Sequence, residues 1–128
     1  MGYDVHITRV EEWSESDENP ILLDEWFEYI KTDPELRLDG FAAAHLPDGG
    51  VLVARSPGLA VWTKWPGHEE PDNYAWIDCE DGRITVKNPD TDILKKMFKI
   101  AQHFNAIVQG DDGELYGSNG EQIAEEDA

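Results

Sequence analysis

Short apolar segments separated by turn sequences fill residues 41–87, and this pattern constrains the fold more than any other feature of the chain. The turns between the segments contain Gly or Pro, in PDGG, SPG and DG, and one longer loop reads PGHEEPDN. Short turns of this kind join neighbouring strands that pair antiparallel. The sequence therefore predicts an antiparallel sheet with strands at residues 41–46, 51–56, 59–65, 74–80 and 83–87.

Residues 21–34 carry the apolar spacing of an amphipathic helix. Leu23, Trp26, Phe27 and Ile30 recur at i, i+3, i+4 and i+7, which places them on one face of a helix. Acidic residues in the first turn interact favourably with the helix dipole, and Pro34 ends the helix. We therefore expect one helix here, packed by its apolar face.

A second helix is predicted for residues 88–105, with Asn88 or Asp90 as its N-cap. Its apolar residues form one stripe, made of Ile93, Met97, Ile100, Ala101 and Phe104. The three lysines of this segment are expected to point to solvent. Asp92 stands four residues before Lys96 and is its expected ion-pair partner.

Strands are also predicted on either side of these segments. Residues 3–9 alternate between apolar and polar side chains, and residues 106–110 and 114–117 flank the turn Asp112-Gly113. The resulting order is β-α-β-β-β-β-β-α-β-β, which lacks the βαβ alternation of a parallel sheet. We therefore predict an α+β fold: a mostly antiparallel β-sheet with two α-helices packed on one face.

The chain length and the distribution of charge suggest the domain organisation. With 128 residues, the sequence fits one domain, which we place at residues 1–117. Residues 118–128 are expected to form an acidic, frayed C-terminal tail. The formal net charge of −18 is concentrated in two segments, because residues 11–35 hold ten acids and one base, and residues 111–128 hold seven acids and no base.

A charge this negative excludes nonspecific attraction to nucleic acid or to anionic membranes. It favours encounter with a cationic partner, although solubility alone would also explain it. No apolar run approaches the ~18–20 residues that span a bilayer, and no segment resembles a signal peptide. One cysteine allows no internal disulfide, so we expect a cytoplasmic protein.

The turn that begins at Asp111 superficially resembles a calcium-binding loop. An EF-hand requires acids at the third and fifth positions, where this chain has Gly113 and Leu115. A tight turn between two short strands is the better interpretation. No phosphate-binding or nucleophile motif occurs elsewhere, so we predict no metal, no cofactor and no enzymatic activity.

Two histidines and the cysteine are the remaining candidates for chemistry. His6 shares a strand face with Asp4, and His68 begins the loop sequence HEEPD; either arrangement would suit a small enzyme if its groups shared a pocket. Cys79 lies between two acids, which disfavour a thiolate, and shares a strand face with Ala75. We therefore expect a buried, structural cysteine.

Tryptophans offer a different signal. Trp26 and Trp76 fit the predicted core, whereas Trp13 lies in an acidic loop and Trp65 precedes another. An exposed Trp ringed by charge is typical of a protein interface. The alternative is that both side chains fold back over the edges of the sheet. Trp62 shares its predicted face with a lysine, so that face is expected to be partly exposed.

Three long stretches carry a resemblance to a known group of proteins. They are MGYDVHITR, LLDEWFEYIKTDPELRLDG and VKNPDTDILKKMFKIAQHFNAIVQGDDGELY, and they are distributed between residues 1 and 116, so the match extends over most of the chain. The chain is similar to the small acidic immunity proteins that protect bacteria from their own secreted polymorphic or type VI toxins. The resemblance implies neutralisation of a cognate toxin by tight binding that covers its active site. It implies no catalytic residue.

We expect such a partner to have a cationic surface and to meet two acidic, Trp-containing loops. The first loop contributes Glu11, Glu12, Trp13, Glu15, Asp17 and Glu18, and the second contributes Trp65, His68, Glu69, Glu70 and Asp72. The chain itself is expected to be a monomer or weak homodimer. Alternatives are an acidic mimic of nucleic acid, which would need carboxylates arrayed along a regular surface, and a small homodimeric adaptor joined through an exposed sheet face.

Overall fold

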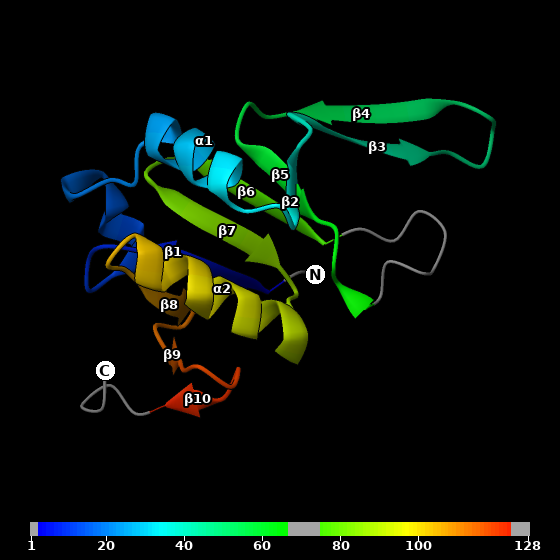
Figure 1. The fold of residues 1–128 in the computed structure, drawn as a ribbon. Helices are drawn as coiled ribbons and strands as arrows, with labels where there is room; N and C mark the ends of the chain where they lie inside the picture. The colour runs from blue at the N-terminus through cyan, green and yellow to red at the C-terminus, as the bar shows by residue number, and fades with distance from the viewer. Residues whose placement is uncertain (1–2, 67–74, 124–128) are drawn as a thin grey trace.

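The computed structural model describes residues 3–66 and 75–123 (Figure 1). The strands are β1 (Asp4–Thr8), β2 (Leu36–Leu38), β3 (Phe41–His45), β4 (Val51–Arg55), β5 (Leu59–Trp62), β6 (Trp76–Glu80), β7 (Arg83–Lys87), β8 (Ile107–Gly110), β9 (Leu115–Tyr116) and β10 (Gln122–Ile123). The helices are the 3-10 segment η1 (Trp13–Glu18), α1 (Leu23–Thr32) and α2 (Thr91–His103).

Eight of these strands form one antiparallel sheet in the order β10-β9-β8-β1-β7-β6-β5-β2. Both α-helices pack on the same face of it, so the predicted α+β fold is confirmed. β1 lies near the middle, where His6 pairs with Thr85 of β7 on one side and with Gln109 of β8 on the other. This register places polar side chains from three strands next to one another.

The core lies between the sheet and the two helices. Trp26 of α1 and Met97 of α2 are fully buried in one cluster with apolar side chains of the sheet, among them Ile7, Ile77 and Ile84. Burial of such residues is the main source of stability in a domain of this size. The helix-facing positions alternate along each strand with side chains on the opposite face, as a pleated strand requires.

One hydrogen bond joins α1 to the turn before β5, and another caps the start of α2. The Trp26 indole N–H donates to the Gly58 carbonyl at 2.7 Å, and the Asp90 carboxylate accepts a hydrogen bond from the Ile93 amide at 2.8 Å. Asp90 is therefore the N-cap of α2, one of the two residues proposed for that role. An N-cap of this kind satisfies an amide that has no partner within the helix.

Lys96 corrects one prediction about α2. It is buried, at 7% exposed, and its ammonium lies 2.7 Å from the Asp33 carboxylate and 3.1 Å from that of Glu35. The expected solvent-facing position and pairing with Asp92 are therefore wrong. The helical spacing of α2 is as predicted, but spacing within one helix does not show that Asp33 and Glu35, which follow α1, contact α2.

The strand predictions also need corrections at both ends of the sheet. β2, at one end, was not predicted. At the other end, β10 lies within residues 118–128, which were expected to fray, and pairs with β9. β3 and β4 pair only with each other among the described strands, in a separate two-stranded sheet. The hairpin was predicted as part of the main sheet, but it projects beyond it (Figure 1).

Candidate functional site

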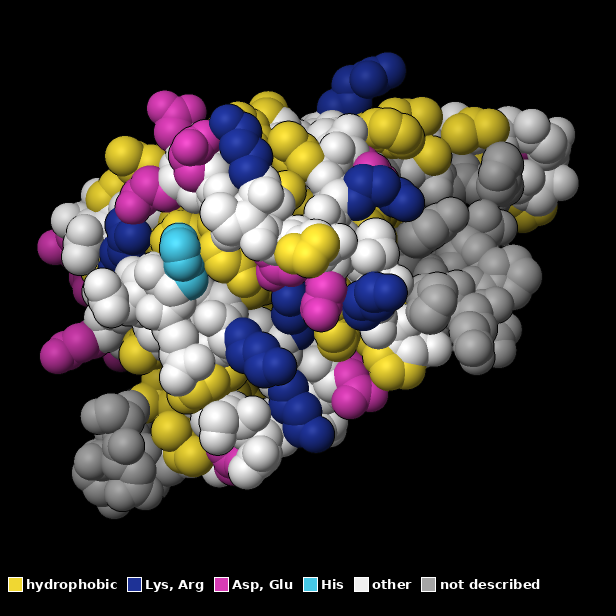
Figure 2. All heavy atoms as spheres, viewed as in Figure 1, with side chains coloured by type: hydrophobic (Ala, Val, Ile, Leu, Met, Phe, Trp, Pro, Cys, Tyr) yellow, Lys and Arg dark blue, Asp and Glu magenta, His cyan; other side chains and the backbone are white. Residues whose placement is uncertain are grey.

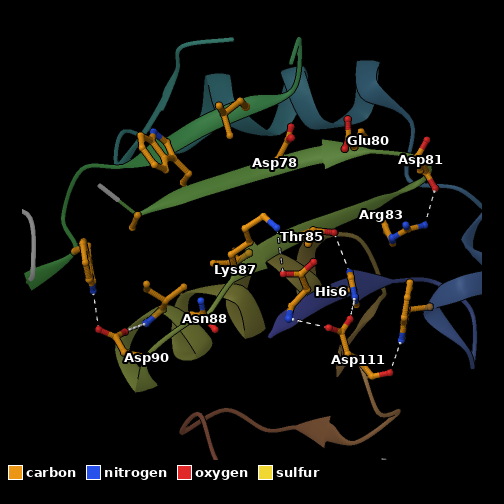
Figure 3. Close-up of a pocket in the computed structure, with 18 residues that line it drawn as sticks. His6, Asp78, Glu80, Asp81, Arg83, Thr85, Lys87, Asn88, Asp90 and Asp111 are labelled. Atoms are coloured by element: carbon orange, nitrogen blue, oxygen red, sulfur yellow. Dashed lines mark hydrogen bonds and ion pairs between the residues drawn. The ribbon is translucent and has the colours of Figure 1, made fainter. Parts of the chain in front are cut away.

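The sheet face opposite the helices carries a groove of about 600 Å³ (Figure 3). β1, β7 and β6 supply much of its lining, through the residues that alternate with the core positions. These residues are Asp4 and His6, then Arg83, Thr85 and Lys87, then Trp76, Asp78 and Glu80. Trp76 was expected in the core and instead lines this groove, because its strand register directs Ala75 and Ile77 to the helices.

The groove combines acids with aromatic rings. Among the described residues, two cations line it, Arg83 and Lys87. Six carboxylates line it as well: Asp4, Asp78, Glu80, Asp81, Asp90 and Asp111. Three of the five tryptophans also line it: Trp13, Trp65 and Trp76. Burial raises the pKa of Asp78, even though its carboxylate accepts a hydrogen bond from the Ser56 hydroxyl at 2.9 Å. This lining suits polar or cationic groups better than anions.

Trp13 closes one end of the groove. Its indole stacks on the His6 imidazole, and its N–H donates to the Asp111 carbonyl at 3.2 Å. The Arg83 guanidinium lies 5.1 Å from the centre of the indole, a cation–π arrangement. Of the two interpretations of Trp13 from the sequence, the one in which it folds back over the sheet is the one observed.

Further hydrogen bonds fix the backbone around η1. The buried side chain of Gln109 accepts a hydrogen bond from the Trp13 amide at 2.7 Å and donates one to the Glu11 carbonyl at 2.8 Å. The buried hydroxyls of Ser16 and Thr8 lie 2.8 Å apart. Residues 11–18 are therefore attached to the sheet at Glu11, Trp13 and Ser16, and the segment has a defined orientation.

Five acids of this segment face solvent. Glu11, Glu12, Glu15, Asp17 and Glu18 are all exposed, and none of them forms an ion pair with a described residue. Each was named from the sequence as a candidate contact; Glu15, Asp17 and Glu18 lie on η1 with Trp13, and Glu11 and Glu12 lie directly before it. We call residues 11–18 the acidic segment. It presents uncompensated negative charge on a backbone that is held in place.

His6 is engaged differently from the sequence prediction, which paired it with Asp4. Its Nε2 lies 2.8 Å from the Asp111 carboxylate and its Nδ1 lies 2.9 Å from the Thr85 hydroxyl. A carboxylate only accepts hydrogen bonds, so Nε2 carries the proton and Nδ1 accepts from Thr85. Asp4 instead lies 3.8 Å from the Lys87 ammonium.

The surroundings of His6 shift two pKa values. Burial lowers the pKa of the imidazole, and the favourable effect of Asp111 does not overcome it. Burial opposes ionisation of Asp111, but hydrogen bonds from the Asp4 amide and from His6 outweigh it and lower its pKa. His6 is 3% exposed, both of its nitrogens are bonded, and Trp13 covers one ring face. This arrangement holds the ring in place and leaves no nitrogen for a substrate.

The second predicted loop is only partly within the described residues. Trp65 packs against the core, lines the groove and donates its indole N–H to Asp90 at 2.8 Å. His68, Glu69, Glu70 and Asp72 lie outside the described residues. Trp62, expected on a partly exposed face, is buried, and its indole N–H donates to Glu35 at 3.0 Å.

Two further predictions concern chemistry. Cys79 is buried as expected, and burial together with Asp78, Glu25 and Glu80 raises the pKa of its thiol to about 12. Asp111 to Gly113 form the predicted turn, with Gly113 at a φ of +89°. Within the described ranges, no group of three or more His, Cys, Asp or Glu side chains is placed to hold a metal ion.

Sequence reasoning missed the residues that hold the site together. Gln109 and Thr85 are polar residues within apolar strands, and Ser16 is one small residue in an acidic run. Polar residues at alternate positions of three strands were the available signal, but only strand register shows that they meet.

No helix among the described residues is long and apolar enough to cross a membrane. Comparison with protein-family models, with curated proteins and with solved structures finds no match to this chain.

Proposed function

We propose that this chain is an immunity protein that binds and neutralises a cognate bacterial toxin through the acidic segment, residues 11–18. In this proposal the protein acts in the cytoplasm, without a cofactor, and its partner carries a cationic surface. The toxin is inhibited because the bound segment covers the region that the toxin uses for catalysis. The five exposed acids of the acidic segment form the centre of the contact, and Trp13 holds the backbone that carries them.

One observation carries the proposal: five exposed carboxylates without described ion-pair partners project from a backbone fixed by Trp13, Ser16 and Gln109. Fixing the backbone before binding lowers the entropy lost on association. Acids that serve only solubility have no need of this support. The arrangement is therefore better suited to binding a partner than to solubility alone.

Charge supports the choice of partner. The net charge of −18 repels nucleic acid and anionic membranes, and it accelerates encounter with a cationic protein. An inhibitor that must reach a lethal enzyme before that enzyme reaches its target benefits from a high association rate. The groove next to Trp13 supplies further acids, including Asp78 and Asp81, for cationic side chains at the edge of the contact.

An acidic mimic of nucleic acid is the second candidate, and it shares the same charge. The acids of the proposed contact lie on the acidic segment, whose residues 13–18 form a 3-10 helix, and around one groove. This arrangement favours contact with a particular protein surface. Competition by duplex DNA for the captured partner separates the two candidates.

The test compares three tagged forms of the full chain in affinity capture from a lysate of the source cells. The first is the wild type, and the second carries Glu15→Lys, Asp17→Lys and Glu18→Lys, three exposed positions that leave Trp13, Ser16 and Gln109 unchanged. We expect one dominant protein on the wild type and its loss from the variant. A matched control with Asp24→Lys, Asp92→Lys and Glu121→Lys makes the same charge change at three other exposed acids without a described ion-pair partner and is expected to retain the partner.

The captured protein is then produced in a bacterial host with and without this chain. Growth arrest by the captured protein, relieved by the wild type and by the control variant but not by the acidic-segment variant, would support immunity. Equal capture by all three forms would overturn the assignment of the contact to residues 11–18. A captured protein that is harmless to the host would overturn the function as an immunity protein.

A further inference from the structure

The β3–β4 hairpin exposes an unusual amount of apolar side chain. Val51 is 53% exposed, Leu52 is 61% exposed and Val53 is 44% exposed, and Phe41 and Leu46 of the same hairpin are also exposed. Figure 2 shows hydrophobic side chains gathered over this end of the molecule. Since successive residues of a strand point to opposite faces, both faces of the hairpin are apolar. A ribbon of two strands is marginally stable in water unless other strands or a helix join it.

The hydrogen bonds of the hairpin show which edge of β4 is free. The Leu46 amide donates to the Gly50 carbonyl, and the Ser56 amide donates to the Gly40 carbonyl. In an antiparallel pair, hydrogen-bonded and non-hydrogen-bonded positions alternate. Gly50 and Ser56 are at hydrogen-bonded positions, so every second residue between them, Leu52 and Ala54, also bonds to β3.

The amides and carbonyls of the alternate residues therefore point away from β3. These residues are Val51, Val53 and Arg55. β4 has no second strand beside it among the described residues. Its outer edge is thus an apolar strand with three residues ready to bond to another strand, the kind of edge that proteins normally protect.

Charge indicates what can occupy this edge. Residues 40–57 contain one acid, Asp48, and one base, Arg55, so this segment is neutral in a chain of net charge −18. A neutral surface exerts little electrostatic attraction on a cationic protein. It is a surface through which two copies of an acidic chain can meet without placing their acidic segments together. In Figure 1 the hairpin and η1 lie at opposite ends of the molecule.

We propose that β4 of one chain pairs antiparallel with β4 of a second copy, about a twofold axis at Val53, to form a four-stranded sheet in the order β3-β4-β4-β3. Val53 then faces Val53 of the second copy, Leu52 faces Ala54 of the second copy, and Val51 faces Arg55 of the second copy. The register is self-complementary, as a twofold interface requires, and sets no two like charges opposite each other. It leaves both acidic segments exposed, so the dimer has two separate binding ends.

The register gives a selective variant. Val53→Pro removes one amide that points outward, while the bonds of Leu52 and Ala54 to β3 remain, so the hairpin itself tolerates the change. The twofold axis doubles the effect, because both copies lose that donor. Val53→Ala is the matched control, since it keeps the amide and shortens the side chain.

The experiment is sedimentation velocity of the full chain over a range of concentrations. The wild type is expected to reach twice its mass of 14.5 kDa. Val53→Pro is expected to weaken the dimer by at least about 30-fold, because two hydrogen bonds are lost. Val53→Ala is expected to weaken it less than Val53→Pro. Far-ultraviolet circular dichroism and tryptophan fluorescence check that both variants are folded. A wild type that stays at 14.5 kDa, or a dimer unaffected by Val53→Pro, would overturn the proposal.

Amide hydrogen exchange gives a second readout that does not depend on a variant. At concentrations where the wild type is dimeric, the amides of Val51, Val53 and Arg55 are expected to be protected, and this protection is expected to disappear on dilution. The amides of Leu52 and Ala54 serve as an internal control, since β3 protects them at every concentration. A dimer in which Val51, Val53 and Arg55 exchange freely would show that β4 is not the contact.

Discussion

The ring centroids of Trp13 and His6 lie 4.2 Å apart, and their planes are inclined by 21°. This stacked pair connects the acidic segment to the middle of the sheet, because His6 belongs to β1 and bonds to Thr85 of β7. The stack therefore adds to the bonds from Gln109 and Ser16 that position the five exposed acids. If the acidic segment binds a partner as proposed, stability and binding are linked at this contact.

Trp13→Ala is expected to lower the free energy of unfolding by about 2 kcal/mol, because it removes the stack, the indole hydrogen bond and the contact with Arg83. Trp13→Phe keeps an aromatic ring and loses the N–H donor, so its cost is expected to be about half as large. Urea denaturation followed by circular dichroism measures both. Equal stability of Trp13→Ala and the wild type would show that the segment is not held by this side chain.

Acid is expected to destabilise the protein through His6. Burial lowers the pKa of His6, whereas the unfolded chain has a value of about 6.5. Below that value the unfolded state binds a proton that the folded state does not, so the free energy of unfolding falls as the pH decreases through 6.5. Asp111 contributes a loss of the same sign at lower pH, below its ordinary value.

Denaturation midpoints between pH 8 and pH 5 test this dependence, with His6→Gln as the control. The raised pKa of Asp78 acts in the opposite direction, so the difference between the wild type and His6→Gln isolates the contribution of His6. We expect the variant to be less stable at pH 8 and to lose less stability on acidification. Parallel profiles for the two proteins would contradict the prediction.

Lys96 and Asp33 form a buried ion pair whose members depend on each other. Lys96→Met leaves the Asp33 carboxylate buried without its cation, and we expect a cost of about 3 kcal/mol. Adding Asp33→Asn is expected to recover part of that loss, since the buried charge is then removed. Guanidinium denaturation of the two single variants and the double variant gives the coupling energy. Simple additivity of the single changes would indicate that the pair makes no specific contribution.

Cys79 is expected to be unreactive in the folded protein. With a thiol pKa of about 12 and a buried sulfur, reaction with iodoacetamide at pH 8 is expected to be at least about 1,000-fold slower than for the urea-unfolded chain. Mass spectrometry of timed samples follows the modification. A rate in the native protein close to that of the unfolded chain would show that the thiol is accessible.

Gly58 lies where the chain leaves no room for a side chain. A Cβ atom there would lie 2.3 Å from the Cys79 carbonyl oxygen and 2.9 Å from the Leu23 side chain. Gly58→Ala is therefore expected to cost about 3 kcal/mol. The matched control is Gly113→Ala, which meets no atom within 4 Å and is expected to cost about 1–2 kcal/mol from its positive φ alone. Thermal unfolding of both variants should show the larger loss for Gly58→Ala.

The sequence predicted the elements whose signal is local. The apolar stripes of α1 and α2, the turn at Asp81-Gly82 and the alternation in β6 and β7 each depend on neighbouring residues, and each is confirmed. Features that depend on distant partners were missed in two places. β2 has three residues and exists because β5 pairs with it, and Lys96 is buried because Asp33 meets it across 63 positions of the chain.

The candidate site was predicted in composition and missed in geometry. Clustered acids identified residues 11–18, and the Trp among them was recognised as either an anchor or a lid. Nothing in the sequence joins Trp13 to Asp111, because the two are brought together only by the pairing of β1 with β8. The groove was not expected, although the alternation that places Ala75 and Cys79 on one strand face places Trp76 and Asp78 on the other. Their neighbours in the groove are set by the pairing of β6 with β7 and of β7 with β1.

The position of β1 has a consequence for biosynthesis. Residues 4–8 find their two neighbouring strands at residues 83–87 and 107–110, so both edges of β1 stay unpaired while most of the chain is being translated. Long separations of this kind slow folding and leave apolar strands open to misassociation. Val5 and Ile7 are therefore exposed to chaperones on the nascent chain until the segment containing β8 has left the ribosome.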